Sequence, residues 1–139
     1  MRRGKNVMAA PIIMHNAFED TYDDADHPIP AVETLDLNVV KKGGGSDLSI
    51  IIASPLKADE RSQRRLLRKI ELYLIFISTP EFERESGAAN PETTSIIVRI
   101  HSGSDAAIFD LLEKCKPWAR ANNADFKVSL LDRPDDRLH

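Results

Sequence analysis

Four polar residues fall at alternating positions of predicted strands, where they would share one face of a sheet. They combine a carboxylate, an imidazole and two cations, which is the kind of set that a small-ligand site uses. The residues are Asp36, Arg99, His101 and Lys127. A histidine on a half-polar sheet is commonly only hydrogen-bonded. A ligand-binding protein or enzyme that uses this set is therefore an alternative hypothesis, and we name no catalytic residue.

A second set of cations lies at helical spacing between residues 61 and 68. Guanidinium groups match phosphate oxygens bidentately, so a helix face built from them could follow a nucleic-acid backbone. The arginines are Arg61, Arg64, Arg65 and Arg68. Acidic neighbours such as Asp59 and Glu71, and the lack of interleaved aromatic residues, favour a merely solvated helix face. Nucleic-acid binding is thus a further alternative, and we do not expect it.

Three other features could indicate specific chemistry, but each has a simpler structural interpretation. The acidic segment that ends at His27 could hold a hard cation, yet it lacks the alternating carboxylates and the glycine of a calcium loop. Cys115 lies in an apolar helical stripe, which favours a buried structural thiol over a nucleophile. The glycines at 43–45 are not followed by the lysine and hydroxyl of a phosphate loop, so they indicate a turn. We expect neither a metal nor a cofactor.

These positions depend on four predicted strands in which apolar and polar residues alternate. The strands span residues 33–41, 48–53, 94–101 and 125–131. In the first strand the odd-numbered residues 35, 37 and 39 are expected to face the core, so Asp36, Asn38 and Val40 would lie on the opposite face. In the other three strands the even-numbered residues are expected to face the core.

Two longer segments carry apolar residues at the 3.6-residue spacing of an amphipathic helix. The first is expected to run from about residue 59 to about residue 77, and Thr79 with Pro80 predicts a short helix from there to about residue 85. The second follows a cap at residues 102–105 and should kink or end early at Pro117. The order ββαβαβ predicts an α+β fold, a two-layer sandwich with a four-stranded mixed sheet and two helices on one face.

Apolar residues exceed what this arrangement covers at two places. Near the end of the first helix, Leu72, Ile75 and Phe76 make the last two turns apolar almost all round. On the open sheet face, apolar residues stand among charged ones, which is typical of a protein-binding surface. Those residues are Val40, Ile51, Ile97 and Leu131. The leading hypothesis is a non-enzymatic domain that acts by protein association, most simply as a homodimer and otherwise with an unidentified protein partner.

The length and net charge of the chain limit its domain organisation and the kinds of partner it could bind. The chain has 139 residues and a net charge of −3, from 19 basic and 22 acidic side chains, which is too balanced to imply a polyanion partner. Residues 1–31 combine acidic residues with prolines and are expected to form a mobile tail before a domain at 32–132 and a frayed end at 133–139. No segment has the length of a membrane span, and the single cysteine fits a reducing compartment, so we expect the cytoplasm.

The helix segment at residues 66–78, the acidic segment after it and the final strand-helix-strand unit ending in Phe126, Lys127 and Val128 occur together in this chain. With these features, residues 33–131 resemble a small bacterial family of domains of unknown function. The resemblance implies the α+β fold and a bacterial, soluble setting. It implies no activity, cofactor or site residue.

Overall fold

The computed structural model describes residues 23–132, in which one four-stranded sheet is combined with three helices. The elements are β1 (Leu37–Val40), β2 (Ser46–Ile52), α1 (Glu60–Phe76), α2 (Pro80–Ser86), β3 (Thr94–Ile100), α3 (Ala106–Ala121) and β4 (Asp125–Leu130). β1 is antiparallel to β2, whereas β2, β3 and β4 run parallel in the order β1-β2-β3-β4. The predicted α+β fold with a mixed four-stranded sheet is confirmed.

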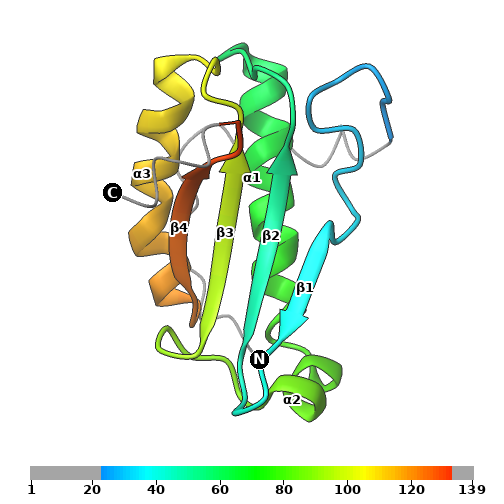
Figure 1. Cartoon of the computed structure of the whole chain (residues 1–139), viewed down its shortest axis with the longest axis vertical. Coiled ribbons are helices and arrows are strands. Elements are labelled where there is room, and N and C mark those ends of the chain that lie inside the picture. The colour runs from blue at the N-terminus through cyan, green and yellow to red at the C-terminus, as the bar shows by residue number, and fades with distance from the viewer. Residues whose placement is uncertain (1–22, 133–139) are drawn as a thin grey trace.

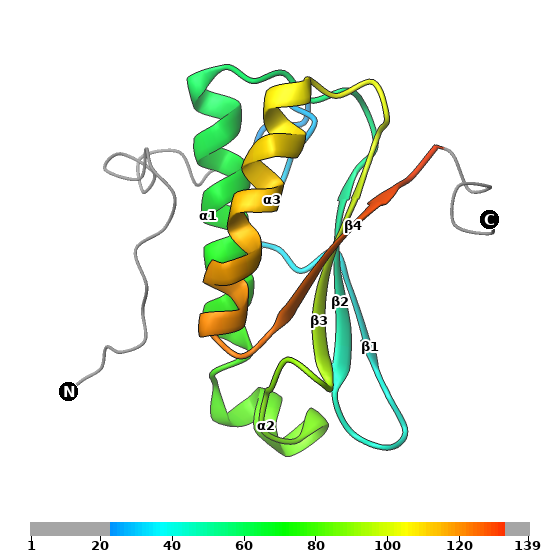
Figure 2. The ribbon, with the colours of Figure 1, turned by 90° about the vertical axis from the view of Figure 1, so that its left-hand side faces the viewer.

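The two long helices lie on the same side of the sheet (Figure 1). Parallel strands need crossover connections, and the segment containing α1 and α2 and then α3 supply them. Seen from the side, α1 and α3 form one layer and the strands another, while α2 lies beyond one end of the sheet (Figure 2). We call the sheet face that points away from α1 and α3 the open face.

The core lies between the sheet and these two helices. The predicted inward positions of β2 and β3 are confirmed, since their side chains are fully buried. The buried residues of the two central strands and the two helices include Leu48, Ile50, Ile52, Ile96, Val98, Ile100, Leu66, Leu67, Ile70, Ile108 and Leu112. In β4, Phe126 is buried and Val128 and Leu130 pack against the same cluster at its margin.

Each helix begins with a side chain that accepts a hydrogen bond from a first-turn amide, which satisfies a donor that has no partner within the helix. These capping residues are Asp59 for α1, Thr79 for α2 and Asp105 for α3. α3 continues through Pro117 to Ala121, so an early end at this proline is wrong. Trp118 and Ala119 beyond it are buried, and their packing offsets the lost backbone hydrogen bond.

Residues 23–36, which we call the N-terminal strap, lie along α1 before the chain enters β1. Ile29 and Val32 of the strap belong to the core and are 1% and 0% exposed. Arg65 of α1 donates to the Ile29 carbonyl oxygen through Nε and Nη2, at 3.1 and 2.6 Å. The structure therefore differs from the predicted tail over residues 23–31. The rest of that tail and the predicted frayed C-terminus lie outside the described residues.

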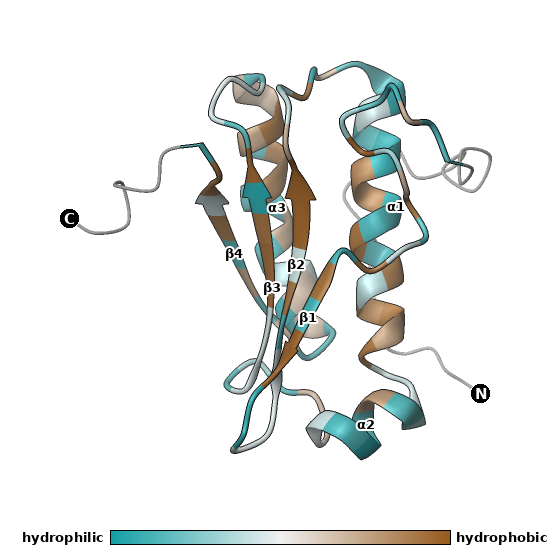
Figure 3. Cartoon of the chain, turned by 45° about the vertical axis from the view of Figure 1, so that its right-hand side comes forward, coloured by the Kyte–Doolittle hydropathy of each residue, from teal (hydrophilic) through white to brown (hydrophobic). Residues whose placement is uncertain are grey.

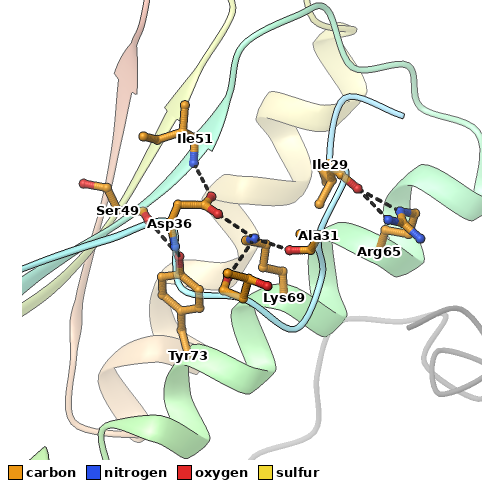
Figure 4. Close-up of polar contacts among 9 residues, drawn as sticks. Ile29, Ala31, Asp36, Ser49, Ile51, Arg65, Lys69 and Tyr73 are labelled. Atoms are coloured by element: carbon orange, nitrogen blue, oxygen red, sulfur yellow. Dashed lines mark hydrogen bonds and ion pairs between the residues drawn. The ribbon is translucent and has the colours of Figure 1, made fainter. Parts of the chain in front are cut away.

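A second set of contacts fixes the end of the strap where β1 diverges from β2 (Figure 4). Lys69 Nζ donates to the carbonyls of Ala31 and Thr34, and to Asp36 Oδ1 at 3.0 Å. The other Asp36 carboxylate oxygen accepts the amide of Ile51 at 2.9 Å. Tyr73 Oη accepts from the Asp36 amide and donates to the Ser49 carbonyl, both at 2.8 Å. Side chains thus satisfy backbone groups at the point where the β1–β2 ladder ends.

Candidate interaction surface

The end of α1, the first predicted apolar surface, is largely covered by the chain itself. The rings of Phe76 and Phe82 meet edge to face with centroids 5.5 Å apart, so α2 shelters one side. Leu72 and Phe76 are half-buried against the core, whereas Ile75 is 51% exposed. A hollow of about 510 Å³ remains beside the strap, lined by Val32, Glu33, Thr34, Leu35, Leu72, Tyr73, Ile75 and Phe76. Of the three predicted residues, Ile75 alone is mainly exposed.

The register of the strands determines which residues share the open face, the second predicted surface. Side chains alternate between the two faces of a strand, so residues between the buried positions of β2 and β3 point away from the helices. From β1 towards β4, three rows of aligned residues lie on this face: Val39, Asp47, Ser95 and Asp125; Leu37, Ser49, Ile97 and Lys127; and Ile51, Arg99 and Ser129. Apolar, hydroxyl and charged side chains are therefore interspersed across the face.

The predicted orientation of β1 is wrong by one residue. Asn38 pairs with Leu48, whose side chain is buried on the helix side of the sheet. Asn38 and Val40 therefore lie on the helix side, and Leu37 and Val39 lie on the open face. A shift of one residue in register moves every side chain of a strand to the other face, and alternation within β1 could not determine which register forms.

β1 nevertheless concentrates the exposed apolar area of the described residues. Leu37, Val39 and Val40 are 44%, 50% and 44% exposed, although the strand has only four residues. Their hydrophobic character is visible where β1 lies at the edge of the sheet (Figure 3). Ile51 and Ile97, both predicted for the interface, are half-buried on the adjoining open face. The predicted Leu131 lies after β4, at the other side of the sheet, and is 37% exposed.

Three of the four polar residues predicted for a ligand site, Asp36, Arg99 and His101, have separate partners. Asp36 lies before β1, where it binds Lys69 and the Ile51 amide instead of facing the open sheet. Arg99 donates from Nε to Ser49 Oγ at 3.0 Å on the open face. Lys127 is exposed on β4. The open-face register therefore brings Arg99 and Lys127 into neighbouring rows but leaves Asp36 at the edge of the sheet.

The fourth predicted residue, His101, lies in the turn after β3. Its Nδ1 accepts the Gly103 amide at 2.9 Å, and its Nε2 lies 3.5 Å from Asp132 Oδ2. Ser102 donates to the same carboxylate from its amide at 2.7 Å and from its hydroxyl at 2.8 Å, and these bonds lower the pKa of Asp132. The hydroxyl thus donates to the carboxylate rather than to the imidazole. This arrangement stabilises a turn and does not activate Ser102 as a nucleophile.

The predicted arginine face is divided between the surface and the interior. Arg65 is 0% exposed and neighbouring Lys69 is 1% exposed, because the strap covers both. The prediction that Arg65 lies on an exposed helix face is therefore wrong. The other arginines form ion pairs: Arg61 with Asp24 and Arg64 with Glu60 at 2.9 Å, and Arg68 with Glu71 at 2.8 Å. Side chains already paired with carboxylates do not form a continuous surface for phosphates.

A polar cluster at the start of α1 has only a weak signal in the sequence, where His27 merely ends an acidic segment. His27 Nε2 lies 2.9 Å from Ser62 Oγ, and Nδ1 accepts the Ile29 amide at 2.9 Å. A neutral ring whose Nδ1 is an acceptor carries its proton on Nε2, so His27 donates to Ser62 and cannot act as its base. The cluster borders a hollow of about 350 Å³, lined by Asp24, Asp26, His27, Pro28, Pro55, Lys57, Asp59, Arg61 and Ser62.

No protein-family model, curated protein or solved structure matches the chain. The resemblance of residues 33–131 to bacterial domains accordingly stays a prediction. Within residues 23–132, none of the helices is long and apolar enough to cross a membrane.

Proposed function

We propose that this protein acts by associating with another protein through the β1 side of its sheet, and that a second copy of the chain is the simplest partner. The observation that carries this proposal is the exposure of Leu37, Val39 and Val40 within one four-residue edge strand. Small soluble domains expose single apolar side chains freely, but a contiguous group of them commonly marks an interaction site. A cytoplasmic location belongs to the same proposal.

The surroundings of β1 suit such a contact. Half-buried Ile51 and Ile97 continue the apolar surface on the open face, and Arg99 and Lys127 lie beyond them. An apolar centre with a polar margin is the usual composition of a protein interface. The end of α1 supports the same role less well. Ile75 is exposed there, but Leu72 and Phe76, the other two residues predicted for that surface, are half-buried.

Sedimentation velocity of the full chain at micromolar concentrations tests the proposal. We expect a dimer for the wild type and a monomer for Val39→Lys, since the new cation would lose hydration in the contact. Within one subunit the lysine would lie across from Asp47, so the fold should tolerate it.

Ile75→Lys is the matched control, because Ile75 is exposed to the same degree as Val39, at 51% against 50%. It should leave the dimer intact. A wild-type chain that stays monomeric up to submillimolar concentration would remove the homodimer from the proposal. Dissociation by Ile75→Lys with a persistent Val39→Lys dimer would move the contact to the end of α1.

A further inference from the structure

We infer that the second copy joins by adding its β1 antiparallel to this β1 across a twofold axis, which would make one continuous sheet through both subunits. The inference rests on the proposed function, because it specifies how the same surface associates. Extended segments commonly bind at an unpaired sheet edge, where backbone hydrogen bonds supply affinity. In the described residues β1 is the end strand of the sheet and pairs with β2 alone.

The hairpin geometry shows which backbone groups of β1 point outward. The Lys41 amide donates to the Gly45 carbonyl at 3.0 Å, so residues 41 and 45 form a hydrogen-bonded pair. Hydrogen-bonded and non-bonded pairs alternate along an antiparallel ladder. Residues 37 and 39 therefore direct their N–H and C=O groups at β2, and Asn38 and Val40 direct theirs at the free edge. Each copy thus offers two donors and two acceptors along β1.

Twofold symmetry restricts the register between two such edges. Facing residues must lie on the same face of the joint sheet, so the centre falls on one residue opposite its own copy. A centre at Val39 pairs Asn38 of each chain with Val40 of the other, and all the outward groups of both residues are then used. A centre at Asn38 would instead pair Val40 with Asp36, whose amide already donates to Tyr73 Oη. The Val39 register is therefore the better match.

Side chains in the Val39 register are also complementary. The two Val39 side chains would meet directly on the open face, in a non-bonded pair with Cα atoms about 4.5 Å apart. Just outside β1, Asp36 at one end and Lys42 at the other carry opposite charges, so an antiparallel copy brings each near the other, although Asp36 also binds Lys69. In natural proteins a charged residue or a proline commonly prevents an edge strand from pairing with another chain. The sequence LNVV of β1 contains neither.

Cysteine cross-linking tests the register. Val39→Cys should form a disulfide-linked dimer on mild oxidation, because the two sulfurs would face each other. Leu37→Cys is the matched control on the same strand and face, since its copies would lie about 13 Å apart along the ladder and should not cross-link. The native Cys115 is 0% exposed and does not compete. Cross-linking of Leu37→Cys without Val39→Cys would overturn the register.

A proline substitution tests the edge itself. Val40→Pro removes an N–H that points away from β2, so the β1–β2 ladder keeps its hydrogen bonds while the edge loses a donor. We expect Val40→Pro to be monomeric, with circular dichroism like the wild type. Lys42→Glu should weaken the dimer at least tenfold, since it places like charges across the contact.

These results separate the two proposals. If the wild type is a dimer but Val39→Cys does not cross-link, association survives and edge pairing is excluded. If Ile97→Cys cross-links instead, the open face forms the contact. If the wild type is monomeric, edge pairing fails together with the homodimer. The cross-linking arm stays decisive even if Val40→Pro does not fold.

Discussion

His27 Nε2 lies 2.9 Å from Ser62 Oγ, so the strap is joined to the first turn of α1 by a histidine whose other ring nitrogen accepts the Ile29 amide. Burial lowers the pKa of His27, and the positive charges of Arg65 and Arg61 lower it further against the opposing effect of Asp24 and Asp59. Protonation would also place a second donor against the Ile29 amide. The strap therefore favours the neutral form of His27.

The first prediction concerns acid stability. Because folding depresses the pKa of His27 below its ordinary value of 6.5, the contribution of His27 is complete above that pH and is lost as the pH falls through the folded-state pKa. Urea denaturation between about pH 8 and pH 5 should show a loss of unfolding free energy in the wild type. His27→Gln keeps a donor for Ser62 and should show a shallower loss. Equal slopes would contradict the prediction. Asp24 and Asp59 do not interfere, since their pKa values are lowered from 3.8.

The second prediction concerns the buried lysine of α1. Lys69→Met leaves the Asp36 carboxylate and two strap carbonyls without their donor, so the unfolding free energy should fall by about 2–4 kcal/mol. Lys116→Met removes a half-buried lysine paired with Glu113 at 3.1 Å near the surface and should cost less than about 1 kcal/mol. Chemical denaturation measures both. Similar small losses would mean that Lys69 is not needed to hold the strap.

The third prediction concerns the β1–β2 hairpin. Gly45 has φ +90°, and a Cβ there would lie within van der Waals overlap of the Thr93 backbone, at 2.1 Å from its carbonyl oxygen. Gly45→Ala should therefore destabilise the fold by at least about 2 kcal/mol, or shift the hairpin. Gly43→Ala meets nothing within 4 Å and is the control, with an expected change within about 0.5 kcal/mol. A Gly45→Ala melting temperature equal to that of the control would refute this account.

The fourth prediction concerns the thiol. Burial raises the pKa of Cys115 to about 12, so little thiolate exists at neutral or mildly alkaline pH. An aromatic disulfide reagent should label the native protein slowly and the urea-unfolded protein at once. Rapid stoichiometric labelling of the native chain would show that α3 opens readily or that the thiol is accessible.

The regular elements follow from local patterns that the sequence contains in full. β2 and β3 bury Ile50 and Val98 with their alternating partners, as expected for strands covered by helices. Asp59 and Thr79 cap α1 and α2, as their positions before helical stretches predict. Hydrophobic periodicity and helix capping depend on residues that are close together in the sequence, so both can be predicted from the sequence alone.

The strap and the face of β1 depend on long-range contacts, which periodicity does not encode. Arg65 and Lys69 resemble solvated residues in the helix pattern, yet carbonyl groups more than thirty positions earlier in the chain cover them. Their long side chains pair with backbone acceptors that no hydropathy pattern displays. The orientation of Leu37 and Val39 likewise depends on the loop that sets the register with β2.

The two outer strands of the sheet differ in how readily a strand of another subunit could pair with them. β1 has no charged residue between Leu37 and Val40, whereas β4 carries Asp125 and Lys127 within its length. A filament needs a receptive strand at both borders of every subunit, and charged border strands discourage such addition. Growth from β1 would therefore halt once two subunits have met, which leaves a finite particle rather than a fibre.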